Sequence, residues 1–271
     1  MTLKIHTRKT QVHARTSHKV LLHTVPFLIV ALLFLNGCDT VEPMDEDDVD
    51  IWTLNDDYVA SASFSYEVAV AQHTRIRLDA VNGPVEIHGD PDATSVRIAG
   101  KRRVGSESMQ DAERHLEDLE VRVEDHTDEV FIKTVQPQQF QGRTYLVDYT
   151  ITLPEHLDVD VDQINGDIKV RNVTGSVWVA LANGVIDCFA TLPPTRLVDL
   201  ALGNGDIKLG IPTSTSAEFS ARVTNGHIST SNLILEGLVR SPRSLIGRLG
   251  DGEGTIELKA VNGNIHVAGH E

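Results

Sequence analysis

The chain has 271 residues and a formal net charge of −15, and 41% of its residues are hydrophobic. A surface this acidic repels phosphate, which argues against nucleic acid and anionic membrane patches as partners. The two cysteines exclude a disulfide-rich scaffold, so the fold has to be stabilised by burial of apolar surface.

The first 37 residues have the order of a secretory signal peptide. Five basic residues precede an apolar run over residues 25–35, and Leu35-Asn36-Gly37-Cys38 follows at its end. The apolar run is about 11 residues long and contains Pro26, whereas a membrane-spanning helix needs about 20 residues. We therefore predict a signal peptide over residues 1–37.

The tetrapeptide that ends in Cys38 resembles the lipoprotein box of bacterial lipoproteins, with Asn36 as a departure from its usual pattern. The resemblance implies that Cys38 carries lipid and anchors the exported chain to a membrane of the cell envelope, either inner or outer. Ordinary secretion and a short membrane anchor stay open as alternatives. Residues 38–62 follow as an acidic flexible tether, because a run of like charges with few apolar residues cannot bury enough surface to fold. A cation site among these acids is a second interpretation.

From residue 76 onward, an Asn-Gly pair occurs six times and marks one repeated template. Counting from each Asn, the positions −6, −4, −2, +3 and +5 are apolar except at Gln163 and Thr230, and the positions between them are mostly polar. This period of two predicts strands with one buried face on both sides of each turn. The pairs are Asn82-Gly83, Asn165-Gly166, Asn183-Gly184, Asn204-Gly205, Asn225-Gly226 and Asn262-Gly263.

The buried positions change from even to odd offsets across each Asn-Gly pair. A two-residue turn with positive φ at both positions produces that change, and Asn and Gly are the residues that tolerate it. Four pairs are spaced by 18, 21 and 21 residues, and side chains match by offset. We therefore predict an all-β fold: a β-solenoid, similar to a single-stranded β-helix, with coils of about 20 residues and an asparagine ladder along one edge. An antiparallel hairpin meander or sandwich, pairing −2 with +3, is the alternative.

Residues 63–271 form the predicted repeat domain, and an insertion near residues 100–155 interrupts it. Residues 107–120 have apolar residues at helical spacing behind Ser106 or Ser108 as a cap, which predicts one short helix. Alternating segments at 119–124, 130–135 and 144–153 predict strands that cover the N-terminal end of the array. Residues 241–254, rich in Gly, Arg and Pro, are predicted to form a loop.

Three stretches resemble V-N-G-x-I-x-V, the repeat of the bacterial putative-adhesin family of envelope proteins. They are residues 81–87, 164–170 and 261–267, and the resemblance extends over about residues 63–269. It implies a β-strand repeat fold and an envelope location. It supplies no catalytic residues, and a fold-level likeness does not define a site.

Few residues outside the template have a pattern that indicates chemistry. The histidines are scattered, without metal-ligand spacing, and no cofactor or metal site is predicted. Asp158, Asp160 and Asp162 alternate along one outward strand face, as a calcium site or the acidic cluster of a polysaccharide lyase would, or as any solvated strand would. Cys188 lies in a buried column, and Gly250–Gly254 is a turn with a faint likeness to calcium-binding repeats. Trp178 is the one large apolar residue in an outward column, which makes it a possible contact with a partner or glycan.

The leading functional hypothesis is a non-enzymatic, lipid-anchored envelope protein that presents a β-repeat surface for adhesion or for binding envelope protein or polysaccharide. A β-helical polysaccharide lyase or hydrolase, resting on the three aspartates, is the enzymatic alternative. A structural or signalling partner within the envelope is the third. The sequence leaves the oligomeric state open.

Overall fold

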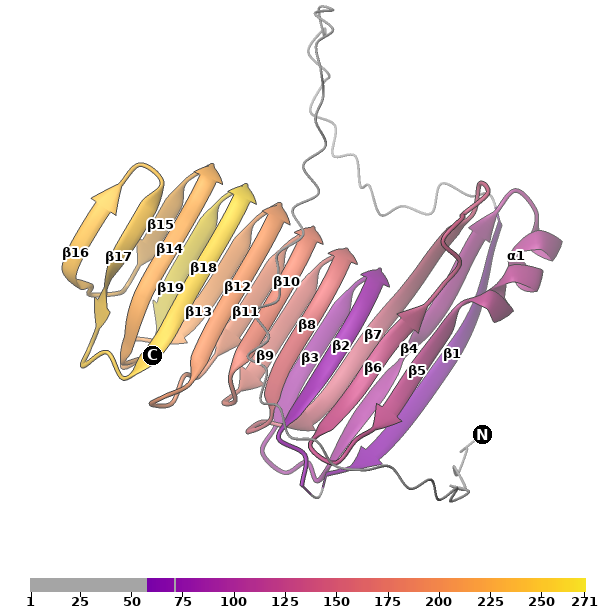
Figure 1. Cartoon of the computed structure of the whole chain (residues 1–271), viewed down its shortest axis with the longest axis horizontal. Coiled ribbons are helices and arrows are strands. Elements are labelled where there is room, and N and C mark those ends of the chain that lie inside the picture. The colour runs from indigo at the N-terminus through magenta and orange to yellow at the C-terminus, as the bar shows by residue number, and fades with distance from the viewer. Residues whose placement is uncertain (1–57, 71) are drawn as a thin grey trace, which may run out of the picture. The chain divides into compact units, whose positions relative to one another are not determined.

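The computed structural model describes residues 58–70 and 72–271 (Figure 1). The predicted signal peptide, Cys38 and the tether up to residue 57 lie outside the described residues. Nine strands form sheet 1, in the spatial order β1 (Tyr58–Ala69), β4 (Ser95–Ser106), β7 (Thr144–Pro154), β3 (Val85–Asp90), β9 (Ile168–Val173), β11 (Ile186–Ala190), β13 (Ile207–Pro212), β19 (Ile265–His270) and β15 (Ile228–Ser231). Ten form sheet 2, in the order β16 (Glu236–Ser241), β17 (Ser244–Leu249), β14 (Ala217–Asn225), β18 (Gly254–Asn262), β12 (Leu197–Asn204), β10 (Val177–Asn183), β8 (Asp158–Asn165), β2 (Arg75–Asn82), β6 (Glu129–Val135) and β5 (Glu120–Asp125).

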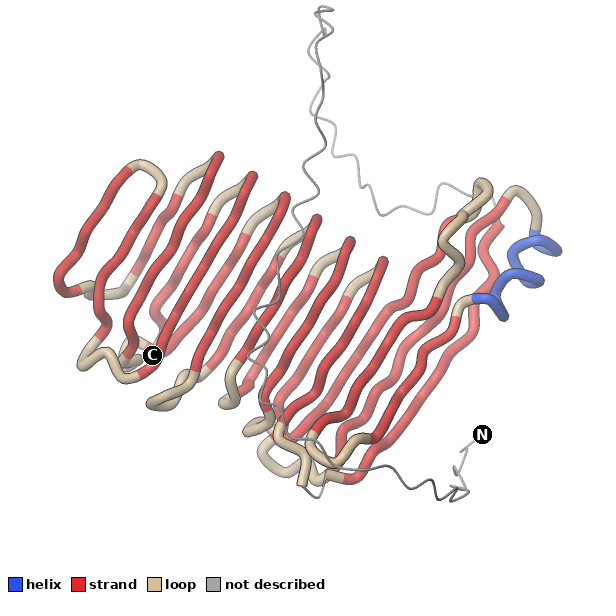
Figure 2. Tube along the Cα trace, in the orientation of Figure 1, coloured by secondary structure: helices blue, strands red, loops and turns tan. Residues whose placement is uncertain are grey.

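The all-β class is confirmed, with two mixed sheets and, among the described residues, one short α-helix (Figure 2). Each of the six Asn-Gly pairs carries the chain from a strand of sheet 2 to a strand of sheet 1. Equal template positions pair in parallel within each sheet, as Val177 does with Val159 and Val198. The hairpin pairing of −2 with +3 is therefore not found at these turns, because their flanking strands belong to different sheets.

The C-terminal strand pair does not stack in chain order. β18 lies between β12 and β14, and β19 lies between β13 and β15 (Figure 1). The chain reaches this place through β16 and β17, of which β17 runs antiparallel to β14 and returns the chain to the start of β18. The predicted loop over 241–254 is accordingly wrong for residues 244–249, which form β17.

The turn geometry corrects one prediction and extends another. Only the glycine of each pair has positive φ, for example +126° at Gly205, whereas the asparagines end their strands outside the positive-φ region. A turn that crosses between sheets does not have to meet the twist of a hairpin, so it needs one left-handed residue rather than two. The six asparagine side chains form a continuous ladder, in the order 82, 165, 183, 204, 262 and 225, with Nδ2 to Oδ1 distances of 2.7–2.9 Å.

The apolar template positions form one buried cluster between the two sheets. The predicted exception Gln163 is also buried, and its Nε2 donates to the carbonyl oxygens of Gly83 and Asn165, both at 2.8 Å. The Nε2 group therefore serves the backbone of a turn, whereas the buried Oε1 accepts no hydrogen bond from the described residues.

The insertion extends both sheets beyond the first repeat. β7 pairs with β3 in sheet 1 and β6 with β2 in sheet 2, so the predicted covering strands continue the two sheets. The helix is shorter than expected: α1 (Met109–His115) begins behind Ser108 as its cap and continues into the 3-10 turn η1 (Leu116–Asp118). β1 pairs along all twelve residues with β4, so residues 58–62, expected in the tether, are strand residues.

Candidate functional site

Trp178 projects from the outer face of sheet 2, as its column predicted. β8, β10 and β12 are neighbours in this sheet, and their register places Trp178 beside Asp160 on one side and Asp199 on the other. Adjacent strands lie about 4.8 Å apart, so each carboxylate stands next to the edge of the indole. The three side chains are all partly buried. We call Asp160, Trp178 and Asp199 the tryptophan row.

Small side chains continue from the tryptophan row toward the Asn-Gly edge. Ala180 pairs with Ala201. Further along the same two strands, Ala182 and Gly203 immediately precede the asparagines. In the strands on either side, the equivalent residues are large and half exposed, Ile164 at 51% and Val261 at 50%. The surface beside Trp178 is therefore low and apolar over these two strands, with Asp162 and Lys259 on either side of the alanine pair.

Burial controls the charge of both carboxylates in the tryptophan row. Partial burial raises the pKa of Asp160, and the neighbouring Asp162 raises it further, whereas Arg77 and Arg75 oppose the shift. Partial burial also raises the pKa of Asp199, with Glu257 adding to the shift and Lys259 opposing it. Neither side chain makes a hydrogen bond or ion pair with any described residue. The oxygens of both carboxylates are therefore accessible to hydrogen-bond donors from outside the protein, beside an aromatic ring.

The three aspartates of β8 do not act as one set. Asp158 accepts hydrogen bonds from the Ser176 N–H at 2.8 Å and from Arg196 Nη1 at 2.9 Å, and thereby fastens the connection to the next coil. Asp162 accepts from Arg77 Nη2 at 3.2 Å. Only Asp160 is left for a ligand, together with the tryptophan that alternation placed on the same face.

Sequence reasoning missed Asp199. It occupies the same template position as Asp160 and Trp178, five residues before an asparagine, so the signal was present in the alignment of the coils. Only the β10–β12 register shows that Asp199 lies beside the indole of Trp178, on the side opposite Asp160.

Other residues singled out in the sequence have structural roles. Cys188 is fully buried, and burial raises the pKa of its thiol to about 12, so it is a core residue. Gly250 and Gly252 have φ of +52° and +78° in a surface turn. Within residues 58–70 and 72–271, no three histidine, cysteine or acidic side chains gather closely enough to hold a metal ion.

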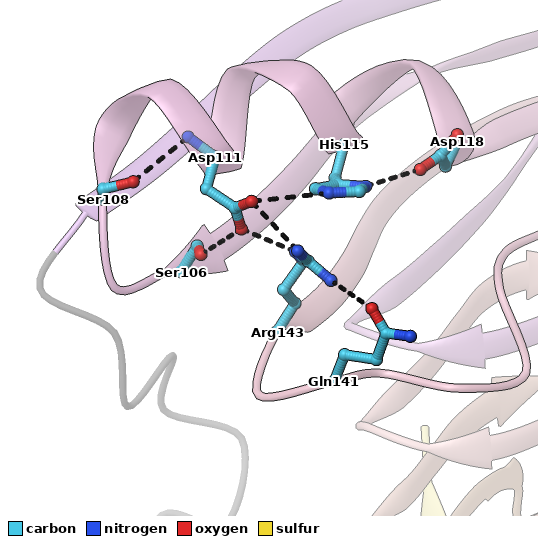
Figure 3. Close-up of polar contacts among 7 residues, drawn as sticks. All are labelled: Ser106, Ser108, Asp111, His115, Asp118, Gln141 and Arg143. Atoms are coloured by element: carbon cyan, nitrogen blue, oxygen red, sulfur yellow. Dashed lines mark hydrogen bonds and ion pairs between the residues drawn. The ribbon is translucent and has the colours of Figure 1, made fainter.

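A second polar cluster joins the short helix to the loop before β7 (Figure 3). The Asp111 carboxylate accepts hydrogen bonds from Arg143 Nε at 2.6 Å, from Arg143 Nη2 at 2.9 Å and from the Ser106 hydroxyl at 2.6 Å. The hydrogen bonds from Arg143 and then from Ser106 hold the pKa of Asp111 well below its usual range. His115 lies between Asp111 and Asp118, with Nδ1 at 2.7 Å from the latter. These groups satisfy one another, so the cluster fixes the helix in place.

Comparisons with known proteins show which solved structures the fold resembles. No family model matches the chain, and no curated protein does. A solved structure of a putative cell adhesion protein from Clostridium sporogenes is similar, with 16% identity, a TM-score of 0.52, and coverage of 77% of this chain and 100% of that one. A putative adhesin from Bacteroides fragilis matches at 12% identity over 76% and 97% of the two chains, with a TM-score of 0.23. At these identities the likeness to the Clostridium protein shows a shared fold alone.

The described residues include no helix long and apolar enough to cross a membrane.

Proposed function

We propose that this chain is a non-enzymatic, lipid-anchored protein of the cell envelope that binds polysaccharide with the outer face of sheet 2. The observation that carries the proposal is the tryptophan row, an indole between two carboxylates that make no hydrogen bond or ion pair with a described residue. The fold is shared with a protein named for cell adhesion, which supports an adhesive role.

The chemistry of the row suits a sugar. An indole is a large apolar surface on which the apolar face of a pyranose ring can stack. Sugar hydroxyls at the ring edge can donate to Asp160 and Asp199, whose lone pairs are otherwise given to water. The low surface of Ala180 and Ala201 lets neighbouring sugar units of a long chain lie flat on the sheet.

The array is best described as a two-sheet β-solenoid whose last coil is inserted between earlier ones. Its support is the parallel pairing of equal template positions and the alternation of successive strands between sheets. A stack of this kind presents an extended face, as repeat proteins that bind extended ligands do. The three aspartates give the enzymatic alternative less support, because Asp158 and Asp162 pair with Arg196 and Arg77.

Replacement of Trp178 by alanine is expected to weaken polysaccharide binding at least tenfold, since truncation of an aromatic anchor removes most of the contact energy. Binding of residues 38–271 with Cys38→Ser to an array of bacterial envelope glycans measures it. Trp178→Phe should keep most of the affinity. Phe189→Ala removes an exposed ring from the other sheet and should change nothing. Equal binding by all four proteins, or no bound glycan at all, would refute the proposal.

The proposed lipid anchor rests on Cys38 and is tested separately. A Cys38→Ser variant is expected to move from the membrane fraction to the soluble fraction of exported protein, measured by fractionation of cells and immunoblotting. Cys188→Ser is the matched control, because this cysteine is buried in the core and should leave the distribution unchanged. Retention of the Cys38 variant in the membranes would mean that another segment holds the chain there.

A further inference from the structure

The two ends of the asparagine ladder differ. At the first end, Asn82 Nδ2 donates to the Tyr145 carbonyl at 3.1 Å, and the Tyr149 N–H donates to the Pro84 carbonyl at 2.9 Å, so β7 closes the stack. At the other end, β15 is the edge strand of sheet 1, and no described strand pairs with its outer side (Figure 1). The asparagine ladder is therefore closed by β7 at one end and open at the other.

A row of repeated backbone hydrogen bonds between successive coils stops at the open end. The glycine N–H of each coil donates to the asparagine carbonyl of the next, as Gly263 does to Asn225 at 2.8 Å. The isoleucine three residues after each later asparagine donates to the carbonyl two residues after the asparagine of the next coil, as Ile265 does to His227 at 2.9 Å. Gly226 and Ile228 hold the equivalent positions in the last coil, where no described residue follows to accept. Asn225 donates to Asn262, and its own Oδ1 receives no donor from the described residues.

Sheet 2 extends beyond this edge. β17 and β16 continue it past β14, whereas sheet 1 stops at β15, so the hairpin overhangs the place of a further strand. Between the last Asn-Gly turn and the hairpin lies a hollow of about 520 Å³, lined by residues 224–228 and 240–245. The hollow lies where the Asn-Gly turn of one further coil would stack on the last turn.

The hollow is positively charged in an acidic protein. Arg240 and Arg243 line it, and both are exposed and make no side-chain hydrogen bond or ion pair with any described residue. Arg171 and Arg196 in the body of the array are paired with Asp187 and Asp158, although Arg222 of β14 has no such partner among the described residues. His227 lies on the same rim. Unpaired guanidinium groups beside open backbone donors favour an occupant with negative charge.

We propose that this end of the array binds an acidic, extended peptide segment of a partner protein, which adds as a strand parallel to β15. Carbonyl groups of the segment accept from the N–H groups of Gly226 and Ile228, an asparagine side chain donates to Asn225 Oδ1, and acidic side chains meet Arg240 and Arg243. An unpaired edge strand is a ready template for such addition, and the backbone contacts supply affinity while the side chains supply selectivity.

The probe is a peptide with the sequence of residues 159–170, VDVDQINGDIKV, which has the template's Asn-Gly pair and three aspartates. Fluorescently labelled, it is expected to bind residues 38–271 carrying Cys38→Ser with a micromolar Kd. Arg240→Glu and Arg243→Glu should each weaken binding at least tenfold. Arg114→Glu, an equal charge change at an exposed arginine of the helix, should leave it unchanged. A peptide with lysine for the three aspartates should not bind.

Two measurements locate the peptide. A version with alanine for asparagine is expected to bind about fivefold more weakly, the effect of one hydrogen bond. Amide hydrogen exchange at Gly226 and Ile228 should slow in the complex. The proposal is overturned if the arginine variants bind the peptide as well as the Arg114 control, or if these two amides exchange at unchanged rates. Concentration-dependent self-association that Arg243→Glu abolishes would also overturn it, in favour of a second copy of the chain.

Discussion

Replacement of Phe219 by alanine is expected to lower the free energy of unfolding by about 4 kcal/mol, the cost of emptying a ring-sized space in a close-packed core. Phe219 is 1% exposed and is the only aromatic residue in the buried template columns. Its register neighbours are Ile256 on β18 and Gly247 on β17. The glycine beside the ring has no side chain of its own to fill the cavity.

The matched control is Phe189→Ala, which removes the same ring from the outer face of sheet 1. Phe189 is 41% exposed and lies under the guanidinium of Arg171, 4.6 Å from the ring centroid. Loss of that contact should cost about 1 kcal/mol or less. Urea unfolding monitored by tryptophan fluorescence measures both variants. Similar losses from the two rings would show that the inward columns are not the close-packed core.

Much of this fold follows from the sequence because a strand's period of two is a local property. The apolar columns identified the buried face of each strand, and Asn-Gly marked where the chain turns. The order of the coils does not follow in the same way. Every coil presents the same template, so β18 fits beside β12 or β14 equally well by offset, and only the β16–β17 hairpin returns it to a place between them.

For the candidate site as well, local features could be predicted from the sequence and long-range contacts could not. Alternation alone placed Trp178 and the three aspartates of β8 on an outer face. The partners of those aspartates are distant in sequence, since Asp158 meets Arg196 across 38 residues and Asp162 meets Arg77 across 85. Such pairs depend on coil stacking and loop conformation, which a one-strand pattern does not describe. The sequence therefore indicated a face, and the register selected which carboxylates on it are unpaired.

Gly205→Ala is the second large effect, with an expected loss of about 3 kcal/mol or more. Gly205 has φ of +126°, a conformation that side chains with Cβ rarely adopt, and an added Cβ would lie 1.9 Å from the carbonyl oxygen of Gly184. The obstacle is backbone of the neighbouring coil, so it cannot swing away as a side chain does. Urea unfolding measures the loss, and a variant as stable as the parent would contradict the stacking.

Gly237→Ala separates the two causes. Gly237 has φ of +59°, within the left-handed region, and no atom lies within 4 Å of an added Cβ, so alanine there should cost about 1 kcal/mol. The excess at Gly205 then measures the clash between coils. The same contact recurs along the array, with the Cβ position of Gly184 2.3 Å from the carbonyl of Gly166. Glycine follows each asparagine because two constraints coincide: the turn needs positive φ, and parallel coils about 4.8 Å apart leave no room for a methyl group between their turns.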